Sequence, residues 1–201
     1  ALLGRNGSGR STTLKAMMGW LTPSSGSVRL KGQELAGARA YTVARRGLAY
    51  VPEERLVFPN LSVEENLLLG ILPGVADAPR WTIEDMYQYF PRLKERRNQK
   101  AGTLSGGEQQ MLTICRSLLG NPLVLLVDEP TEGLAPKIVE VVTEVINDIY
   151  RKGVGVLLVE QKMSMAFKVA QNVLIMGHGE IVFSGSAADM HANDDIRRQW
   201  L

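Results

Sequence analysis

The chain has 201 residues, a net charge of +2 and a single cysteine, Cys115. That length can bury one large hydrophobic core, and the nearly balanced charge argues against a surface built to hold nucleic acid. One cysteine excludes an intramolecular disulfide and a cysteine-based zinc cluster, and because no apolar run is long enough to cross a bilayer and no signal peptide is visible, any membrane role must come through a partner.

The first element is the end of a predicted strand, Ala1–Leu3, which is followed by a glycine-rich loop and a helix from Thr12. The residues from Gly4 to Thr12 nearly match the phosphate-binding pattern of Gly, four residues, Gly, Lys, then Ser or Thr. Its glycines let backbone N–H groups turn inward at the positive end of a helix dipole, where an anion binds. Arg10 stands where the pattern has Lys, which keeps the charge and changes its geometry. Because the chain opens inside this strand without a Met, we expect an N-terminally truncated fragment.

Two more strands are predicted in the first 57 residues, at 27–30 and 47–51. The next stretch, residues 58–119, has a helical pattern. Its predicted helices are residues 66–69, 83–89, 92–97 and 105–119. Ser62 precedes the first of them in a capping box.

From residue 120 onward, strand and helix signals alternate, which favours a parallel sheet covered on both faces. The predicted strands are residues 123–127, 154–159, 173–176 and 181–183, and the predicted helices are residues 136–151 and 163–170. The first of these strands is continuously apolar and ends in Asp128 and Glu129. Acidic residues at that end of a buried strand lie where open α/β sheets bind ligands, so Asp128 is a candidate for holding Mg²⁺ and Glu129 for polarising an attacking water. Two solvated carboxylates are the alternative, which the cost of burying the strand against two charges disfavours.

The segment Leu104-Ser105-Gly106-Gly107-Glu108 begins the last helix of the 58–119 stretch, and Ser105 and Glu108 form a capping box. Two glycines in the first turn cost about 1 kcal/mol each relative to alanine, which a purely structural helix start does not require. Close approach of an anion to bare backbone N–H groups explains them. Since the chain already has one phosphate loop, we expect this second anion site to serve the nucleotide of another copy.

The three motifs resemble, in order and approximate spacing, those of the ATP-binding subunits of ABC transporters, and the resemblance covers essentially the whole chain. It implies an α/β phosphate-loop NTPase (RecA-like) fold with a mostly parallel sheet and an inserted helical subdomain. The single ABC ATPase domain, 1–201, would comprise a core of residues 1–57 and 120–201 and a helical subdomain of residues 58–119. It also implies ATP and Mg²⁺ as cofactors, ATP hydrolysis coupled to transport, and a peripheral position at the cytoplasmic face of the inner membrane.

Position by position, the resemblance implies a nucleotide site, a metal site and two catalytic residues. The nucleotide-binding residues would be Gly4, Asn6, Gly7, Ser8, Gly9, Arg10, Ser11 and Thr12, with Ser105, Gly106, Gly107 and Glu108 acting on the nucleotide of the partner. The metal-binding residues would be Ser11, Glu53 and Asp128, and the catalytic residues would be Glu129 and Gln161. Glu53 and Gln161 stand where most members of the family have Gln and His. Gln can donate a hydrogen bond to phosphate but cannot become cationic.

Three segments, residues 50–67, 131–136 and 157–161, are similar to the second, smaller ATP-binding subunit of high-affinity branched-chain amino-acid importers. This similarity implies a second ATP-binding subunit, membrane permease subunits and, indirectly, a periplasmic binding protein as partners, and it leaves homo- and heterodimers open. Importers of urea and short amides belong to the same broad group, so the solute is open as well. An apolar docking groove for the membrane partner is expected around Phe58, although core packing would explain the same residues.

Two functions of other classes stay open. A soluble ABC ATPase acting on DNA or ribosomes would normally show a coiled coil, a zinc insertion or a basic linker, and the stretch from Arg55 to Leu104 has mixed charge and no cysteine. A nucleotide-gated dimerisation module with little hydrolysis is motivated by Arg10 and Gln161.

Overall fold

The computed structural model describes residues 1–201, which form one six-stranded sheet with helices on both faces and a separate two-stranded sheet. The strand order in the large sheet is β4-β5-β6-β1-β7-β8. These strands are β4 (Leu48–Val51), β5 (Val124–Asp128), β6 (Gly155–Glu160), β1 (Leu2–Leu3), β7 (Asn172–Gly177) and β8 (Glu180–Ser186). All neighbours pair in parallel except β7 and β8, which are antiparallel. The mostly parallel sheet expected from the sequence is therefore confirmed.

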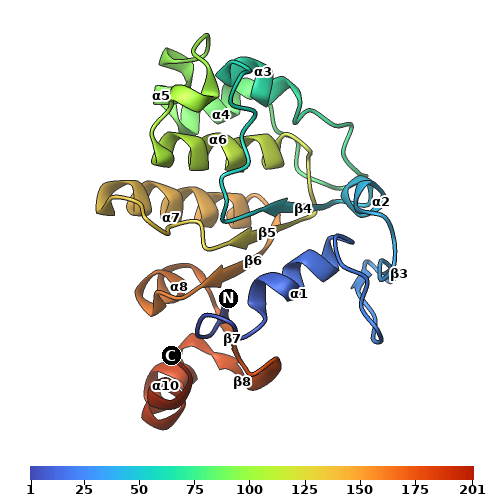
Figure 1. Ribbon diagram of the computed structural model, residues 1–201, viewed down its shortest axis with the longest axis vertical. Helices are drawn as coiled ribbons and strands as arrows, with labels where there is room; N and C mark the ends of the chain where they lie inside the picture. Colours follow the sequence, from blue (N-terminus) through green and yellow to red (C-terminus); the bar gives the residue numbers. More distant parts are fainter.

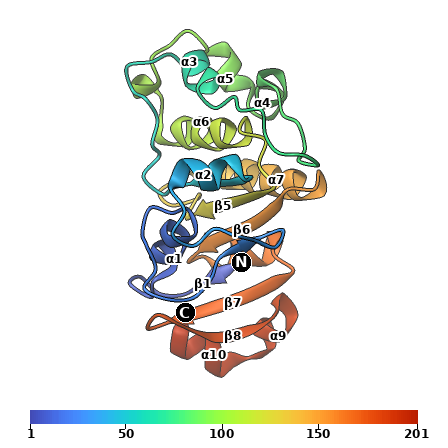
Figure 2. The ribbon, with the colours of Figure 1, turned by 90° about the vertical axis from the view of Figure 1, so that its right-hand side faces the viewer.

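The helices gather in two groups. A block of helices lies at one end of the molecule, beyond β4 and α7, and the remaining helices lie along the sheet (Figures 1 and 2). The helices of the block are α3 (Val63–Leu68), α4 (Ile83–Tyr89), α5 (Pro91–Glu95) and α6 (Gly106–Leu118), with a 3-10 turn at Ala101–Thr103 before α6. The others are α1 (Arg10–Met17), α2 (Ala40–Arg45), α7 (Pro136–Arg151), α8 (Met163–Val169), α9 (Ala187–Ala192) and α10 (Asp194–Trp200).

Strand β5, which lies between β4 and β6, packs on a different helix on each face. Its buried Leu125 and Val127 belong to the same hydrophobic cluster as Ile149 of α7. Leu126 faces the other way and clusters with Leu14 of α1. This division follows from the two-residue period of a strand, and the continuous apolar sequence of β5 is what a strand covered on both sides requires. The first cluster continues into α3 and α6, so the helical block shares its core with the sheet.

The strand predicted at residues 27–30 is present in part, and it lies outside the main sheet. Arg29–Leu30 (β2) pairs instead with Gln33–Glu34 (β3) in the two-stranded sheet. Lys31 and Gly32 form its turn with φ of 47° and 77°. Exposed polar residues suit a small sheet at the surface and not a buried parallel one.

Three helices were missed, and the bounds of a fourth differ by one or two residues from those predicted. The sequence reading did not include α2, α9 or α10, which are short and have little apolar periodicity. The helix expected at 92–97 is α5, which Pro91 begins at the first helical position and which ends at Glu95. Proline suits that position because its missing N–H would have no partner there.

Candidate functional site

The register of three parallel strands brings their carboxyl ends together. Leu3 of β1 pairs with Glu160 of β6, and Val159 pairs with Asp128 of β5. The loops that follow these strands therefore leave the sheet at one edge and next to one another. This edge is where ligands bind in open α/β sheets.

The loop after β1 wraps into the start of α1. Gly9 caps the helix with φ of 105°, a conformation that favours glycine, and no side chain caps the first turn. A polar cavity of about 380 Å³ opens beside this turn and has no hydrophobic residue in its wall. It is lined by Asn6, Gly7, Ser8, Gly9, Arg10, Ser11, Thr12, Glu53, Glu129, Glu132 and Gln161. Of the phosphate-loop residues named from the sequence, only Gly4 lies outside this wall, at the point where the chain leaves β1.

Asp128 lies behind the cavity wall and reaches it through Ser11. The Ser11 hydroxyl donates to Asp128 Oδ1 at 3.1 Å, and the Tyr50 hydroxyl donates to Oδ2 at 2.9 Å. Burial raises the pKa of Asp128, although the two hydroxyl groups oppose that shift. Burial also raises the pKa of Tyr50, and the nearby negative charge of Asp128 raises it further. Asp128, a carboxylate at the end of a buried strand, therefore has hydrogen-bond donors for both of its oxygens.

Glu129 is held by two side chains from other elements. Arg10 Nη2 lies 2.9 Å from Glu129 Oε1, and both side chains are almost fully buried. The amide of Gln161 donates to Oε1 at 3.0 Å and to Oε2 at 2.8 Å, and it also donates to Asn6 Oδ1 at 2.6 Å. Glu129 itself has a positive φ of 42°, which is rare outside glycine and typical of a residue that its surroundings hold in place.

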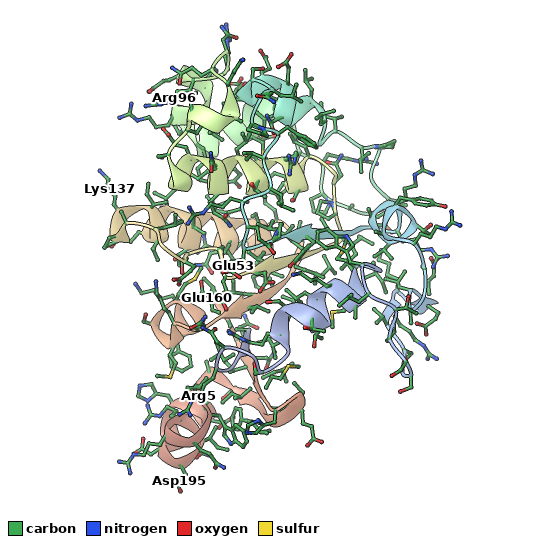
Figure 3. The ribbon with its side chains drawn as sticks, viewed as in Figure 1. Arg5, Glu53, Arg96, Lys137, Glu160 and Asp195 are labelled. Carbon is green, nitrogen blue, oxygen red and sulfur yellow. The ribbon has the colours of Figure 1, made fainter.

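Glu53 lines the same cavity from the loop after β4. Partial burial, and then the negative charges of Glu129 and Asp128, raise its pKa. Figure 3 shows the Glu53 and Glu160 side chains near the middle of the molecule, between α7 and α1. The carboxyl groups of Glu53, Glu129 and Glu132 thus line the same cavity as the phosphate loop.

The segment from Ser105 to Glu108 does not line this cavity. Ser105 caps α6, with its hydroxyl accepting from Glu108 N, while Glu108 accepts in turn from Ser105 N at 2.9 Å. Glu108 also pairs with Arg96 at 3.1 Å. Arg96 lies by α5, well apart from Glu53 and Glu160 (Figure 3). Within one chain, the two glycine-rich segments are therefore separate.

Arg55 joins three segments around the start of α6. Its Nη2 donates to the carbonyl oxygen of Glu132 at 2.7 Å. Its guanidinium also lies directly against Gly106, where a Cβ would clash with it, and close to Gly133. The loop after β4, the loop after β5 and the N-terminus of α6 are thereby connected through one side chain.

The sequence reading missed Tyr50, Arg55 and the buried pair of Thr131 and Glu160. The Thr131 hydroxyl donates to Glu160 Oε1 at 2.7 Å, and burial raises the pKa of Glu160. The sequence contained a weak indication that Glu160 belongs to the site, because an acidic residue at the end of an apolar strand needs a hydrogen-bonding or charged partner. It contained no such indication for Tyr50 and Arg55, because their partners lie far away in the sequence.

A second, apolar hollow lies between the sheet and the helical block. It has a volume of about 450 Å³, and Trp20, Phe58 and Leu69 are among its lining residues. All three side chains are substantially exposed. The guanidinium of Arg116 lies over the Phe58 ring, 4.9 Å from the ring centre. The exposure of Phe58 favours the docking-groove interpretation over core packing.

No helix combines the length and the hydrophobicity needed to traverse a bilayer. No three His, Cys, Asp or Glu side chains stand close enough together to hold a metal ion by themselves.

Comparison with known proteins identifies related chains. Residues 1–132 match the family model described as ABC transporter. The chain is 44% identical over 200 residues to the high-affinity branched-chain amino acid transport ATP-binding protein BraG of Pseudomonas aeruginosa, covering 100% of this chain and 86% of the relative. It is 37% identical to the probable branched-chain amino acid transport ATP-binding protein LivF of Archaeoglobus fulgidus, covering 98% of this chain and 84% of the relative. A solved ATP-binding subunit of an ABC transporter is 30% identical, with a TM-score of 0.78 over 98% of this chain and 80% of that one.

Proposed function

Because this chain belongs to the ABC transporter family of ATP-hydrolysing subunits, we propose that it energises the import of branched-chain amino acids. The observation that carries the nucleotide part is the polar cavity in which the phosphate loop, Glu129 and Gln161 meet. The names of the two curated relatives support the solute. Importers of urea or short amides are the alternative within the same group.

In this proposal, the backbone N–H groups from Gly7 to Thr12 hold the phosphates of ATP at the start of α1. Glu129 orients and polarises the attacking water as general base, and Gln161 holds the Glu129 carboxylate in position. Both groups already point at one another across the cavity wall. Gln161 stays neutral at every pH, so it supplies hydrogen bonds and no charge.

The residues at the Ser11 end of the cavity fit Mg²⁺. Ser11 and Asp128 offer hard oxygen ligands 3.1 Å apart, and Glu53 lines the same cavity. Mg²⁺ is typically held by one or two carboxylates together with phosphate oxygens and water, so a complete protein cage is not required. Bound there, the ion would neutralise charge on the phosphates; Ser11 would be its direct ligand, and Asp128 would orient Ser11.

A second copy, or a second ATP-binding subunit, would complete the nucleotide site. Ser105, Gly106 and Gly107 begin a helix of 13 residues, and they lie outside the cavity of their own chain. A nucleotide held between two subunits accounts for both glycine-rich segments.

The apolar hollow that contains Phe58 would receive a membrane permease subunit. Its exposed aromatic and aliphatic side chains suit a short amphipathic segment of a partner. The chain would then lie at the cytoplasmic face of the membrane as a peripheral subunit.

The test is reconstitution with the permease subunits and the binding protein encoded beside this chain, in proteoliposomes. We expect ATP hydrolysis to rise when the binding protein carries leucine, and not when urea or acetamide is supplied. Stimulation by urea or acetamide alone would contradict the proposed solute.

A nucleotide-gated dimerisation module with little hydrolysis is the second candidate. It is favoured by one observation, the engagement of both Glu129 oxygens by Arg10 and Gln161. Single-turnover hydrolysis by the assembled complex distinguishes the two, because a module of this kind would release its ATP unchanged.

A further inference from the structure

Arg10 spends its hydrogen-bond donors on groups of the protein itself. Its side chain is only 4% exposed. Nη1 donates to the carbonyl oxygen of Glu160 at 2.9 Å, and Nη2 donates to Glu129 Oε1 at 2.9 Å. A longer contact of 3.4 Å joins Nη2 to Asn6 Oδ1. The guanidinium therefore spans the ends of β5 and β6.

This arrangement depends on the shape of arginine. A guanidinium presents donors in a rigid planar fork, whereas a lysine ammonium is a compact charge that cannot reach two separated acceptors in the same way. The Arg10–Glu129 pair is also buried, so removing one partner would leave the other as an uncompensated charge. Glu129 and Arg10 consequently stay together unless another charged group replaces one of them.

Nucleotide phosphate is such a group. It would enter the cavity that Arg10 and Glu129 both line, and it would compete with the Glu129 carboxylate for the guanidinium. Glu129 would not be left without a hydrogen-bond donor, because Gln161 contacts both of its oxygens. One anion thus replaces another at Arg10, while the Glu129 carboxylate keeps the hydrogen bonds of Gln161 and loses its cationic partner.

We infer that Arg10 is a positioning residue for Glu129, and that phosphate binding transfers Arg10 from this carboxylate to the nucleotide and so releases the general base. The inference rests on the proposed nucleotide site. If the inference holds, the Glu129 carboxylate competes with nucleotide phosphate for Arg10. Removing its charge should then raise the affinity for nucleotide, including ADP, which undergoes no turnover.

The experiment measures ADP binding by calorimetry to four forms of the chain, namely the parent, Glu129→Gln, Arg10→Lys and the double variant. ADP keeps the phosphates but gives no turnover. We expect Glu129→Gln to tighten ADP binding about tenfold in the parent and at most about threefold in the Arg10→Lys background, a difference within the range of coupling between contacting residues.

Glu132→Gln is the matched control, because Glu132 lines the same cavity and forms no hydrogen bond or ion pair with Arg10. This substitution removes one negative charge, and it should change ADP affinity by the same factor in the parent and in the Arg10→Lys background. Equal tightening by Glu129→Gln in both backgrounds would overturn the inference while leaving nucleotide binding intact. Absence of ADP binding in all four forms, with cooperative thermal unfolding preserved, would overturn the proposed function as well.

Discussion

Arg55 lies directly against the Cα of Gly106, and the absence of a side chain at position 106 is what lets its guanidinium reach the carbonyl oxygen of Glu132. The glycine therefore serves a contact within the chain, in addition to the approach of an anion inferred from the sequence. The first turn of α6 also carries the Glu108 carboxylate, which offsets the positive guanidinium beside the positive end of the helix.

Gly106→Ala should weaken ATP-dependent dimerisation about tenfold, or ~1.4 kcal/mol, because the new methyl group displaces Arg55. The measurement is sedimentation with a non-hydrolysable ATP analogue, and ADP binding to the single chain should not change. If the effect passes through Arg55, the double variant Gly106→Ala/Arg55→Ala should dimerise no worse than Arg55→Ala. Additive losses would show that Gly106 acts independently of Arg55.

Arg10→Lys should raise the ATP turnover of the assembled complex by about tenfold, equivalent to ~1.4 kcal/mol of barrier. Lysine cannot span Glu129 and the Glu160 carbonyl, so phosphate no longer has to displace the side chain at position 10 from Glu129 before Glu129 can orient water. Steady-state phosphate release at saturating ATP is the measurement. Turnover equal to or below that of the parent would be evidence against this role of Arg10.

Phe58→Asp should weaken association with the permease subunits about thirtyfold, or ~2 kcal/mol, as loss of an aromatic anchor does. The fold should survive, because Phe58 is 49% exposed and Arg116 can pair with the new carboxylate. Co-purification is the measurement. Ile181→Asp, at a side chain that is 48% exposed on β8, is the control and should co-purify normally. Unaltered co-purification of the Phe58 variant would exclude the hollow as the docking site.

Glu160→Gln should remove part of the pH dependence of the free energy of unfolding. Burial raises the pKa of Glu160 above its ordinary value of 4.5, so the folded chain binds this proton more tightly than the unfolded chain. The parent therefore loses stability as the pH rises from about 4.5 through the raised pKa, and the variant lacks that loss. The free energy of unfolding of the variant minus that of the parent should therefore be larger at pH 7 than at pH 4, as measured by denaturant titrations.

Glu65→Gln supplies a control of opposite sign. Hydrogen bonds from the Ser62 backbone and hydroxyl lower the pKa of Glu65, so its contribution is present above the ordinary pKa and is lost as the pH falls through the folded value. This variant should therefore be less stable than the parent at neutral pH, and the difference should shrink in acid. The same sign for both variants would contradict the assigned shifts.

The features that the sequence determined by itself depend on residues close together in the chain. Glycine spacing before α1, the apolar run of β5 ending in Asp128, and the capping box of Ser105 and Glu108 are all complete within a few positions. Their chemistry is local, because a turn, a helix cap or a buried strand is specified by its own residues. The family and its mostly parallel sheet were predictable for this reason.

The tertiary structure alone decided which distant groups meet. Arg10 has its main partners 119 and 150 positions away, and the separation of Tyr50 from Asp128 is 78. The strand order that sets β1 between β6 and β7 creates these contacts, and no short segment encodes it. A pattern could identify Arg10 as a cation beside a phosphate loop, but only the packed sheet places its guanidinium on Glu129, because a buried charge takes the partner that folding brings to it.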